Sequence, residues 1–416
     1  MKSLGRVLDS PRHGLAPGWL AEGIRRAGWV GLCLAATTGL GMAQPRFLPA
    51  PDQVVLPVSL HTLGAVSRDL KTAEQAWRRE PRNLDAAIRY ARQAFLVGIT
   101  EGDLRWFGTA KAALLPWWTQ SGLSAEGHFM RGLVKQGFHD FQGGLDDINA
   151  AIALDDGQAE FWSWRFAIHL VWADMSAARA DCAAMAQRFA PDEARACGAI
   201  LAYRTGKALT AVPALQALVA LPDFQGDLAQ DWLRFHLGEA QRTAGQYQQA
   251  VATWSGHLAK RPRAHSIRLA LVELLNAEGQ PAQAKRWATT AAPTDALLMQ
   301  QFLASHALND ADAPRLAQQV EERMTAQALR QETLIERPRM VYLIRHGKDV
   351  AAGLALAEAN WAIQKEPPDA ALLVEAALKL NRPQAAVPVL DWMTETGYTD
   401  PALAAMTRQL KSRLGR

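Results

Sequence analysis

The sequence predicts an all-α protein built from short helices that pack in antiparallel pairs. Alanine and leucine dominate a composition that is 49% hydrophobic and 7% aromatic, which is ample material for a core. Apolar residues recur at spacings of three and four, the period of an amphipathic helix, whereas strand-like alternation is scarce. Glycines and prolines interrupt this pattern at intervals of about 34 residues, which indicates a repeated unit.

The clearest unit is 231–264, which reads as two short amphipathic helices joined by a turn at Gly245. Pro262 closes the unit, because a helix rarely continues into a proline. We expect Gly238 to let the two helices cross closely, with Trp254 as the bulky side chain that fills the space beside it. The second helix carries its apolar stripe at Tyr247, Ala250, Trp254 and Leu258.

This order of Leu-Gly, Gly-x-Tyr, alanine, an aromatic residue and a final proline resembles the tetratricopeptide (TPR) repeat. The resemblance implies a right-handed superhelical solenoid of stacked antiparallel helix hairpins over 61–416, with about nine pairs and a C-terminal capping helix. Two residues depart from the pattern: Arg165 stands where leucine is usual, and Gly144 stands where alanine is usual. The clearest repeats are expected at 125–158, 159–191, 192–225, 231–264, 265–298, 336–369 and 367–400.

The remaining elements follow from local signals along the chain. Four prolines in 44–60 predict an extended lead-in. Asp312 followed by Pro314 is a start signal for the second helix of a weaker unit, and Asp400-Pro401 starts the final helix in the same way. The expected segments are a helix over 63–80, a hairpin of 83–97 and 103–115, a weaker pair over 295–331, and a short insertion at 223–230.

The N-terminus has the three parts of a secretory signal over 1–43. Arg25-Arg26 precede seventeen apolar or small residues, and Gly41 and Ala43 suit a cleavage site after Ala43. Arginine greatly outnumbers lysine, which is typical of a GC-rich bacterium, so we expect a periplasmic protein. An uncleaved anchor in the inner membrane remains the alternative, although the stretch is shorter than the roughly 20 residues of a spanning helix. The paired arginines leave a twin-arginine export route open.

The charge distribution argues against nucleic-acid binding. The formal net charge is +4, but residues 1–43 hold five basic and two acidic side chains, so removing their +3 leaves +1. The remaining body also lacks a basic run that could follow a phosphate backbone. We therefore expect contact with a membrane only through an uncleaved signal segment.

One motif suggests catalysis. Residues 341–347, VYLIRHG, resemble the opening strand and Arg-His-Gly loop of histidine phosphatases, which implies a phosphatase using Arg345, His346 and Gly347 as a low-ranking alternative. The 69 residues that follow, 348–416, read as helices and contain no second histidine. Catalysis needs the whole constellation of residues, so we expect a non-enzyme.

Metal-binding and cofactor-binding motifs are also missing from the sequence. His128 and His139 are separated by most of a hairpin, and neither His-Glu-x-x-His nor Cys-x-x-Cys occurs. Four further histidines read as isolated packing or surface residues: His169, His236, His257 and His306. We expect no metal and no cofactor. Cys182 and Cys197 fall on neighbouring helices, where they either form a disulfide or serve as small buried apolar residues.

The remaining candidate site is the concave face. The TPR resemblance implies that the first helix of each pair lines a groove that binds a partner peptide or helix, with aromatic residues and arginine as hot spots. The resemblance selects Phe129, Leu133, Tyr203, Trp232, Phe235, Glu239, Arg242, Glu273 and Asn276. The leading prediction is a non-catalytic protein-binding scaffold of the cell envelope. The alternative is an accessory factor in export or assembly of an envelope polysaccharide or outer-membrane component. The sequence identifies neither the partner nor the oligomeric state.

Overall fold

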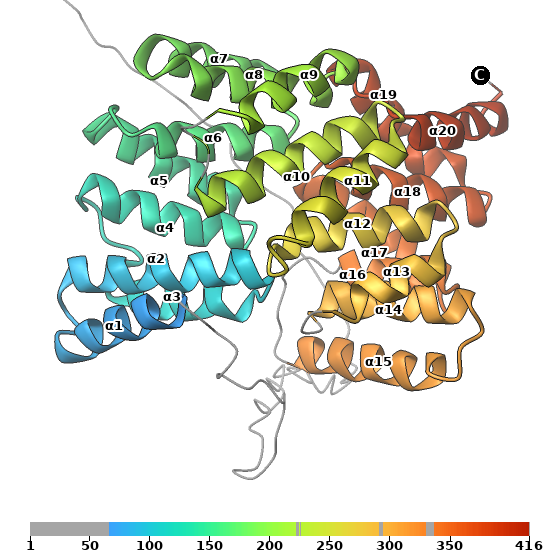
Figure 1. Ribbon diagram of the computed structural model, residues 1–416, viewed down its shortest axis with the longest axis horizontal. Helices are drawn as coiled ribbons and strands as arrows, with labels where there is room; N and C mark the ends of the chain where they lie inside the picture. Colours follow the sequence, from blue (N-terminus) through green and yellow to red (C-terminus); the bar gives the residue numbers. More distant parts are fainter. Residues whose placement is uncertain (1–65, 222–223, 225, 291–293, 330–336, 416) are drawn as a thin grey trace, which may run out of the picture. The chain divides into compact units, whose positions relative to one another are not determined.

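The computed structural model describes residues 66–221, 224, 226–290, 294–329 and 337–415, all within one compact unit, Phe47–Arg416. The predicted signal over 1–43 and the lead-in over 44–60 lie outside the described residues. Every regular element in the described ranges is helical, so the all-α prediction is confirmed (Figure 1).

The helices are short and follow one another closely along the chain. The first ten are α1 (Val66–Arg79), α2 (Leu84–Glu101), α3 (Arg105–Leu114), α4 (Ala125–Gly137), α5 (Phe141–Leu154), α6 (Ala159–Val171), α7 (Met175–Arg188), α8 (Pro191–Arg204), α9 (Ala208–Val219) and α10 (Asp227–Thr243). The next ten are α11 (Tyr247–Leu258), α12 (His265–Ala277), α13 (Pro281–Ala288), α14 (Asp295–Ala307), α15 (Ala313–Leu329), α16 (Arg337–Arg345), α17 (Val350–Ile363), α18 (Pro367–Lys379), α19 (Val387–Thr396) and α20 (Pro401–Arg413). The 3₁₀ segment η2 (Leu115–Trp117) follows α3, and the 3₁₀ segment η4 (Pro383–Ala386) precedes α19.

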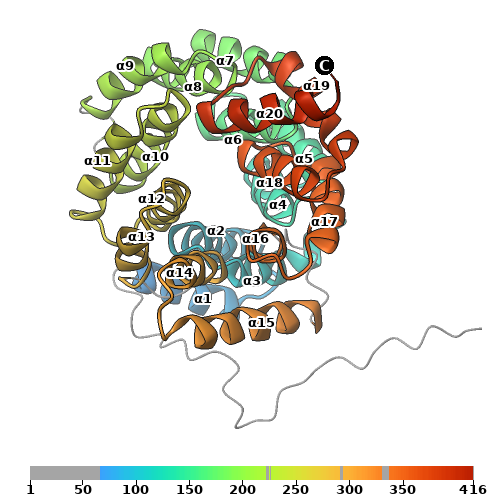
Figure 2. The same cartoon turned by 90° about the vertical axis from the view of Figure 1, so that its right-hand side faces the viewer.

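Consecutive helices pack as hairpins, and the hairpins stack. From α2 onward each even-numbered helix packs against the helix that follows it, and it also contacts the even-numbered helices of the neighbouring pairs. The described residues thus form nine pairs, from α2–α3 to α18–η4–α19, with α1 before them and α20 as the cap. Figure 2 shows α8, α10 and α12 on the inside of the curve and α9, α11 and α13 on the outside. We call the even-numbered helices the inner helices.

Three helix starts lie close to the ends of expected segments. Helix α10 begins at Asp227, so half of the expected insertion at 223–230 belongs to the helix. Helix α14 begins at Asp295 because the Thr294 side chain caps it, so the repeat expected over 265–298 ends earlier. Helix α18 begins at Pro367, a residue suited to the first turn of a helix, so the expected overlap of 336–369 with 367–400 resolves in favour of the second repeat.

Small residues allow close crossings within the hairpins, as expected. A Cβ added to Gly238 would lie 2.0 Å from Nε1 of Trp254, so the fully buried indole ring lies directly over this glycine. In the α4–α5 hairpin a Cβ on Gly132 would lie 3.0 Å from the carbonyl oxygen of Gly144. The departure from the repeat pattern at Gly144 therefore lets the two backbones approach each other.

Buried ion pairs join the two helices of several hairpins. Asp181 on α7 accepts hydrogen bonds from Arg165 at 2.6 Å and from His169 at 2.8 Å, both on α6. Asp147 on α5 binds His128 and Arg131 of α4 in a similar way, at 2.9 and 2.5 Å. Arg165, unusual for a TPR position, therefore has a structural role: it pairs with a buried aspartate, and a buried charge needs a partner.

Cys182 on α7 and Cys197 on α8 form a disulfide with a Cα–Cα distance of 5.5 Å. The bond joins the second helix of one hairpin to the first helix of the next.

Contacts between distant hairpins hold one turn of the solenoid against the next. Glu101, at the end of α2, pairs with Arg263, which immediately precedes Ala264 and helix α12. The backbone N–H of Lys365 donates to the carbonyl oxygen of Val171 at 2.8 Å. Three more contacts join α8 and α10 to the last helices: Arg204 with Glu366 at 3.9 Å, Arg242 with Asp400 at 3.9 Å, and the close approach of Gly206 to Gly397. These contacts limit how far the inner helices can separate.

Candidate binding surface on the inner helices

The nine residues expected in the groove all lie on inner helices, but their exposure differs. Phe129, Leu133 and Tyr203 are 0%, 2% and 4% exposed, so they pack between helices and do not present an open surface. Trp232 is 41% exposed. The other five are half-buried: Phe235, Glu239, Arg242, Glu273 and Asn276. The accessible part of the predicted site therefore lies on α10 and α12.

One face of α10 carries a continuous stripe, which we call the α10 stripe: Leu228, Trp232, Phe235, Glu239 and Arg242. Spacings of four, three, four and three place these side chains on a single face of the helix. The opposite face, which includes Leu233, Leu237 and Ala240, is buried against the neighbouring helices. The stripe is apolar in its first half, with Leu228 55% exposed, and charged in its second half.

Aromatic rings surround His236 beside the apolar half of the stripe. Its ring lies 4.9 Å from that of Trp232 and 5.3 Å from that of Phe235, both in edge-to-face geometry. Burial lowers the pKa of His236 to about 3, and the neighbouring Arg204 adds to this effect, so the imidazole is neutral at pH 7. A neutral imidazole has one donor and one acceptor nitrogen, and Nδ1 shares a 2.8 Å hydrogen bond with the Tyr203 hydroxyl. This bond holds the His236 ring in place against Trp232.

The charged half of the stripe is paired within the protein. Arg242 donates to Glu239 at 2.9 Å and lies 3.9 Å from Asp400. Asp400 caps α20 through the N–H of Leu403 and accepts from the Tyr398 hydroxyl at 2.9 Å. Glu239 and Asp400 thus already engage Arg242. Because Asp400 caps α20, the start of α20 covers this end of the stripe.

Glu273 on α12 is a carboxylate of the inner face with few partners. In the described part of the chain its side chain accepts one long hydrogen bond, from Nε2 of Gln300 at 3.4 Å, and forms no ion pair. Burial raises the pKa of the Glu273 carboxyl, and the guanidinium groups of Arg337 and Arg345 offset part of that increase. Asn276 holds Gln300 in place by donating to its side-chain and backbone oxygens, both at 3.0 Å. Glu273 can therefore accept further hydrogen bonds from a ligand.

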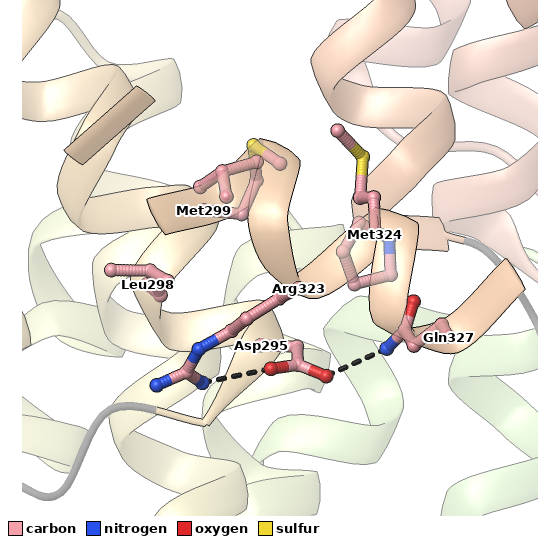
Figure 3. A pocket seen from close by; sticks show the side chains of 8 residues that line it. Asp295, Leu298, Met299, Arg323, Met324 and Gln327 are labelled. Carbon is pink, nitrogen blue, oxygen red and sulfur yellow. Dashed lines mark hydrogen bonds and ion pairs between the residues drawn. The ribbon is translucent and has the colours of Figure 1, made fainter. Parts of the chain in front are cut away.

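Two cavities lie away from this surface. The one shown in Figure 3 lies between α14 and α15, where Arg323 and Gln327 both reach the Asp295 carboxylate at 2.8 and 2.6 Å. Its volume of about 10 Å³ suffices for about one water molecule. A wider hollow of about 250 Å³ lies between the α6–α7 turn and the end of α17, beside Trp172 and Ile363. Neither is a site for an extended partner.

The Arg-His-Gly motif does not have the surroundings of a phosphatase. Residues 337–345 form helix α16 and not a strand, with Val341, Tyr342 and Ile344 buried in the core. The strand that the resemblance requires is thus replaced by the first helix of a hairpin. In the described residues no group of three or more His, Cys, Asp or Glu side chains could hold a metal ion. No described helix is long and apolar enough to cross a membrane.

Sequence reasoning missed one pair of residues on this side of the molecule. His306, near the end of α14, and His346, just after α16, lie with ring centroids 4.9 Å apart. The available signal was their register, since both fall at the C-terminal ends of inner helices in consecutive pairs.

Neither a family model nor a curated protein matches the chain. Among solved structures, the Rap protein complexed with competence and sporulation factor is similar at 11% identity and a TM-score of 0.43, covering 84% of this chain and 99% of that one. The Cut9 hetero-tetramer with Hcn1 gives 13% and 0.31, covering 84% and 88%, and Naa15/Naa10 bound to HypK-THB gives 13% and 0.24, covering 84% and 64%. At these identities and TM-scores the likenesses assign neither a family nor a function.

Proposed function

We propose that this protein is a non-catalytic scaffold of the bacterial cell envelope that binds a peptide or helix of a partner protein on its inner helices. The observation that carries the proposal is the α10 stripe, where Trp232 is 41% exposed on an inner helix. A tryptophan on a rigid helix is a typical hot spot, because it offers a large contact area and loses little conformational freedom on binding.

The neighbouring groups support the same reading. The 2.8 Å hydrogen bond between Tyr203 and His236 holds the His236 ring against Trp232, so the apolar half of the stripe is preorganised. Among the described residues, Glu273 on the adjacent inner helix has one long bond, to Gln300, so it can accept from backbone or side-chain donors of a bound segment. Together these groups offer an apolar anchor and a polar acceptor, the usual combination at a protein interface.

The proposed address is the periplasm, with the signal cleaved after Ala43. The disulfide between Cys182 and Cys197 supports this proposal, because structural disulfides form in the oxidising periplasm and are rare in the cytosol. N-terminal sequencing of protein released by osmotic shock should begin at Gln44. Protein that stays in the membrane fraction with residues 1–43 intact would favour the anchored alternative.

Site-specific photo-crosslinking tests the binding surface in living cells. A photoreactive phenylalanine derivative is placed at Trp232, and a matched control is placed at Leu209, which is 68% exposed on the outer helix α9. We expect position 232 to give adducts with one defined partner. Most of these adducts should be lost when Glu273→Gln is added. Position 209 should give none of them. The proposal fails if both positions give the same adducts, or if position 232 gives none.

A further inference from the structure

Two histidines far apart in the sequence lie side by side on the inner helices. His306 belongs to the last turn of α14, and His346 follows Arg345, the last residue of α16. Their ring centroids are 4.9 Å apart and their planes are nearly perpendicular, at 88°. His306 is exposed and His346 is half-buried, so the pair lies at the surface.

The nitrogen atoms of this pair are not engaged elsewhere. Within the described ranges no hydrogen bond or ion pair uses a ring nitrogen of His306 or His346, and Nδ1 of His346 is buried without a partner. The histidines that serve hairpin packing behave differently. His128, His169 and His257 each place a ring nitrogen on an aspartate, at 2.9, 2.8 and 2.6 Å.

The spacing of the two rings suits a shared ligand. Imidazole nitrogens bind divalent transition metals at about 2.0–2.1 Å. Since the ring centroid lies about 1.1 Å behind the nitrogen, two such ligands place their centroids about 4.5 Å apart at a right angle and about 5.2 Å apart at a tetrahedral angle. The observed 4.9 Å lies between these two values.

The surroundings hold the rings in place and nearly balance the local charge. Phe302 and Tyr342, both buried, pack against His346 at 5.0 and 5.1 Å between ring centroids. Next to them the Glu321 carboxylate pairs with Lys348 and accepts from the Tyr342 hydroxyl at 2.6 Å. The Lys348 ammonium group is thus neutralised by its own partner.

We propose that His306 and His346 form a two-histidine site for a divalent transition-metal ion of the Cu²⁺, Ni²⁺ or Zn²⁺ class, with water completing the coordination. Imidazole is a ligand that suits these three ions, and Cu²⁺ binds most tightly to a given nitrogen site. A pair without a third preformed ligand agrees with the finding that the described residues contain no ready group of three. The site is independent of the partner-binding surface on α10.

Copper titration of the untagged full-length protein, stripped with EDTA, tests the site. Calorimetry should show one Cu²⁺ per chain, and the electron paramagnetic resonance spectrum should show two coordinated nitrogens. His306→Phe and His346→Phe keep an aromatic ring against Phe302 and remove only the nitrogen ligands. Each variant should bind Cu²⁺ more than about tenfold more weakly, with one nitrogen lost from the spectrum and an unchanged thermal midpoint.

Two results would overturn the proposal. One is Cu²⁺ binding by the double variant, His306→Phe with His346→Phe, at the stoichiometry and affinity of the wild type, which would place the metal elsewhere on the chain. The other is the absence of saturable binding to the wild-type protein. A variant that loses both metal binding and thermal stability is replaced by His306→Gln, which keeps a polar surface residue at the exposed position.

Discussion

Substitution of Gly238 by alanine should destabilise the α10–α11 hairpin, although alanine favours helices. The new Cβ would lie 2.0 Å from Nε1 and 2.1 Å from Cε2 of Trp254, where ordinary contact begins at 3.4 Å, so the indole or the helix must move by about 3.4 − 2.0 = 1.4 Å. Trp254 is fully buried and has little room to retreat. Overpacking of this kind costs about 1–3 kcal/mol or more, whereas the gain in helix propensity is only about 1 kcal/mol.

The same hairpin provides the matched control. A Cβ on Gly256, inside α11, would meet nothing within 4 Å. Gly256→Ala should therefore stabilise the protein by roughly 0.5–1 kcal/mol, and the two variants should differ by roughly 0.5–3 kcal/mol in the free energy of unfolding. Urea denaturation followed by circular dichroism and tryptophan fluorescence measures this difference. Both probes are needed, because repeat proteins can unfold in stages.

The two glycine variants must move in opposite directions. Equal stability of Gly238→Ala and Gly256→Ala would mean that the hairpin absorbs the extra methyl group at no cost. In that case Trp254 would not be held where the structure places it, and the account of close crossings at small residues would be wrong.

Three further predictions concern other parts of the solenoid. Reduction of the Cys182–Cys197 disulfide, which closes a loop with a sequence separation of 15, should cost about 3 kcal/mol; dithiothreitol should lower the thermal midpoint of the wild type but not that of Cys182→Ser. Burial alone would raise the pKa of Asp147, but its hydrogen-bond donors outweigh burial and hold the pKa below its usual range. Its contribution should therefore be present above about pH 4 and lost as the pH falls through the folded pKa, and Asp147→Asn should flatten this acid limb in denaturation measured from pH 2 to 7. A Cβ on Gly206 would lie 2.3 Å from the carbonyl oxygen of Gly397 in the adjacent turn of the solenoid, whereas Gly122 has a similar positive φ and open surroundings. The thermal midpoint should therefore fall further for Gly206→Ala than for Gly122→Ala. Equal losses would show that the two solenoid turns do not touch there.

Local signals in the sequence were sufficient for the fold, because each hairpin is defined by its own residues. Gly245 adopts the positive φ of 76° that the turn requires, and Trp254 packs where the repeat pattern places its bulky residue. The start of α15 after Asp312 likewise agrees with the sequence signal of an aspartate followed by an early proline. These features depend on neighbours within about 34 residues, which is the length of one repeat.

The exposure of the inner face could not be predicted from the same signals. The family pattern indicates which side of an inner helix faces the groove, but not how closely the next inner helix approaches. Phe129 is covered by Phe161 of the following inner helix, with ring centroids 4.4 Å apart, and Tyr203 is covered through His236. Repeats with smaller residues in place of Phe161 and His236 would leave the positions of Phe129 and Tyr203 exposed. The His306–His346 pair was missed for a related reason, since each histidine is unremarkable until α14 and α16 are placed side by side.

The contacts between successive turns restrict how a partner reaches the inner helices. The ion pairs there are individually weak, but the 2.8 Å backbone hydrogen bond from Lys365 to Val171 and the approach of Gly206 to Gly397 require the turns to lie close together. Since Arg242 is engaged by Asp400, the charged half of the α10 stripe is covered while Trp232 at the other half stays exposed. A partner should therefore dock from the N-terminal end of α10 and meet Trp232 first. Binding should then depend on Trp232 far more than on Arg242, because replacing the arginine would mainly loosen the contact between turns.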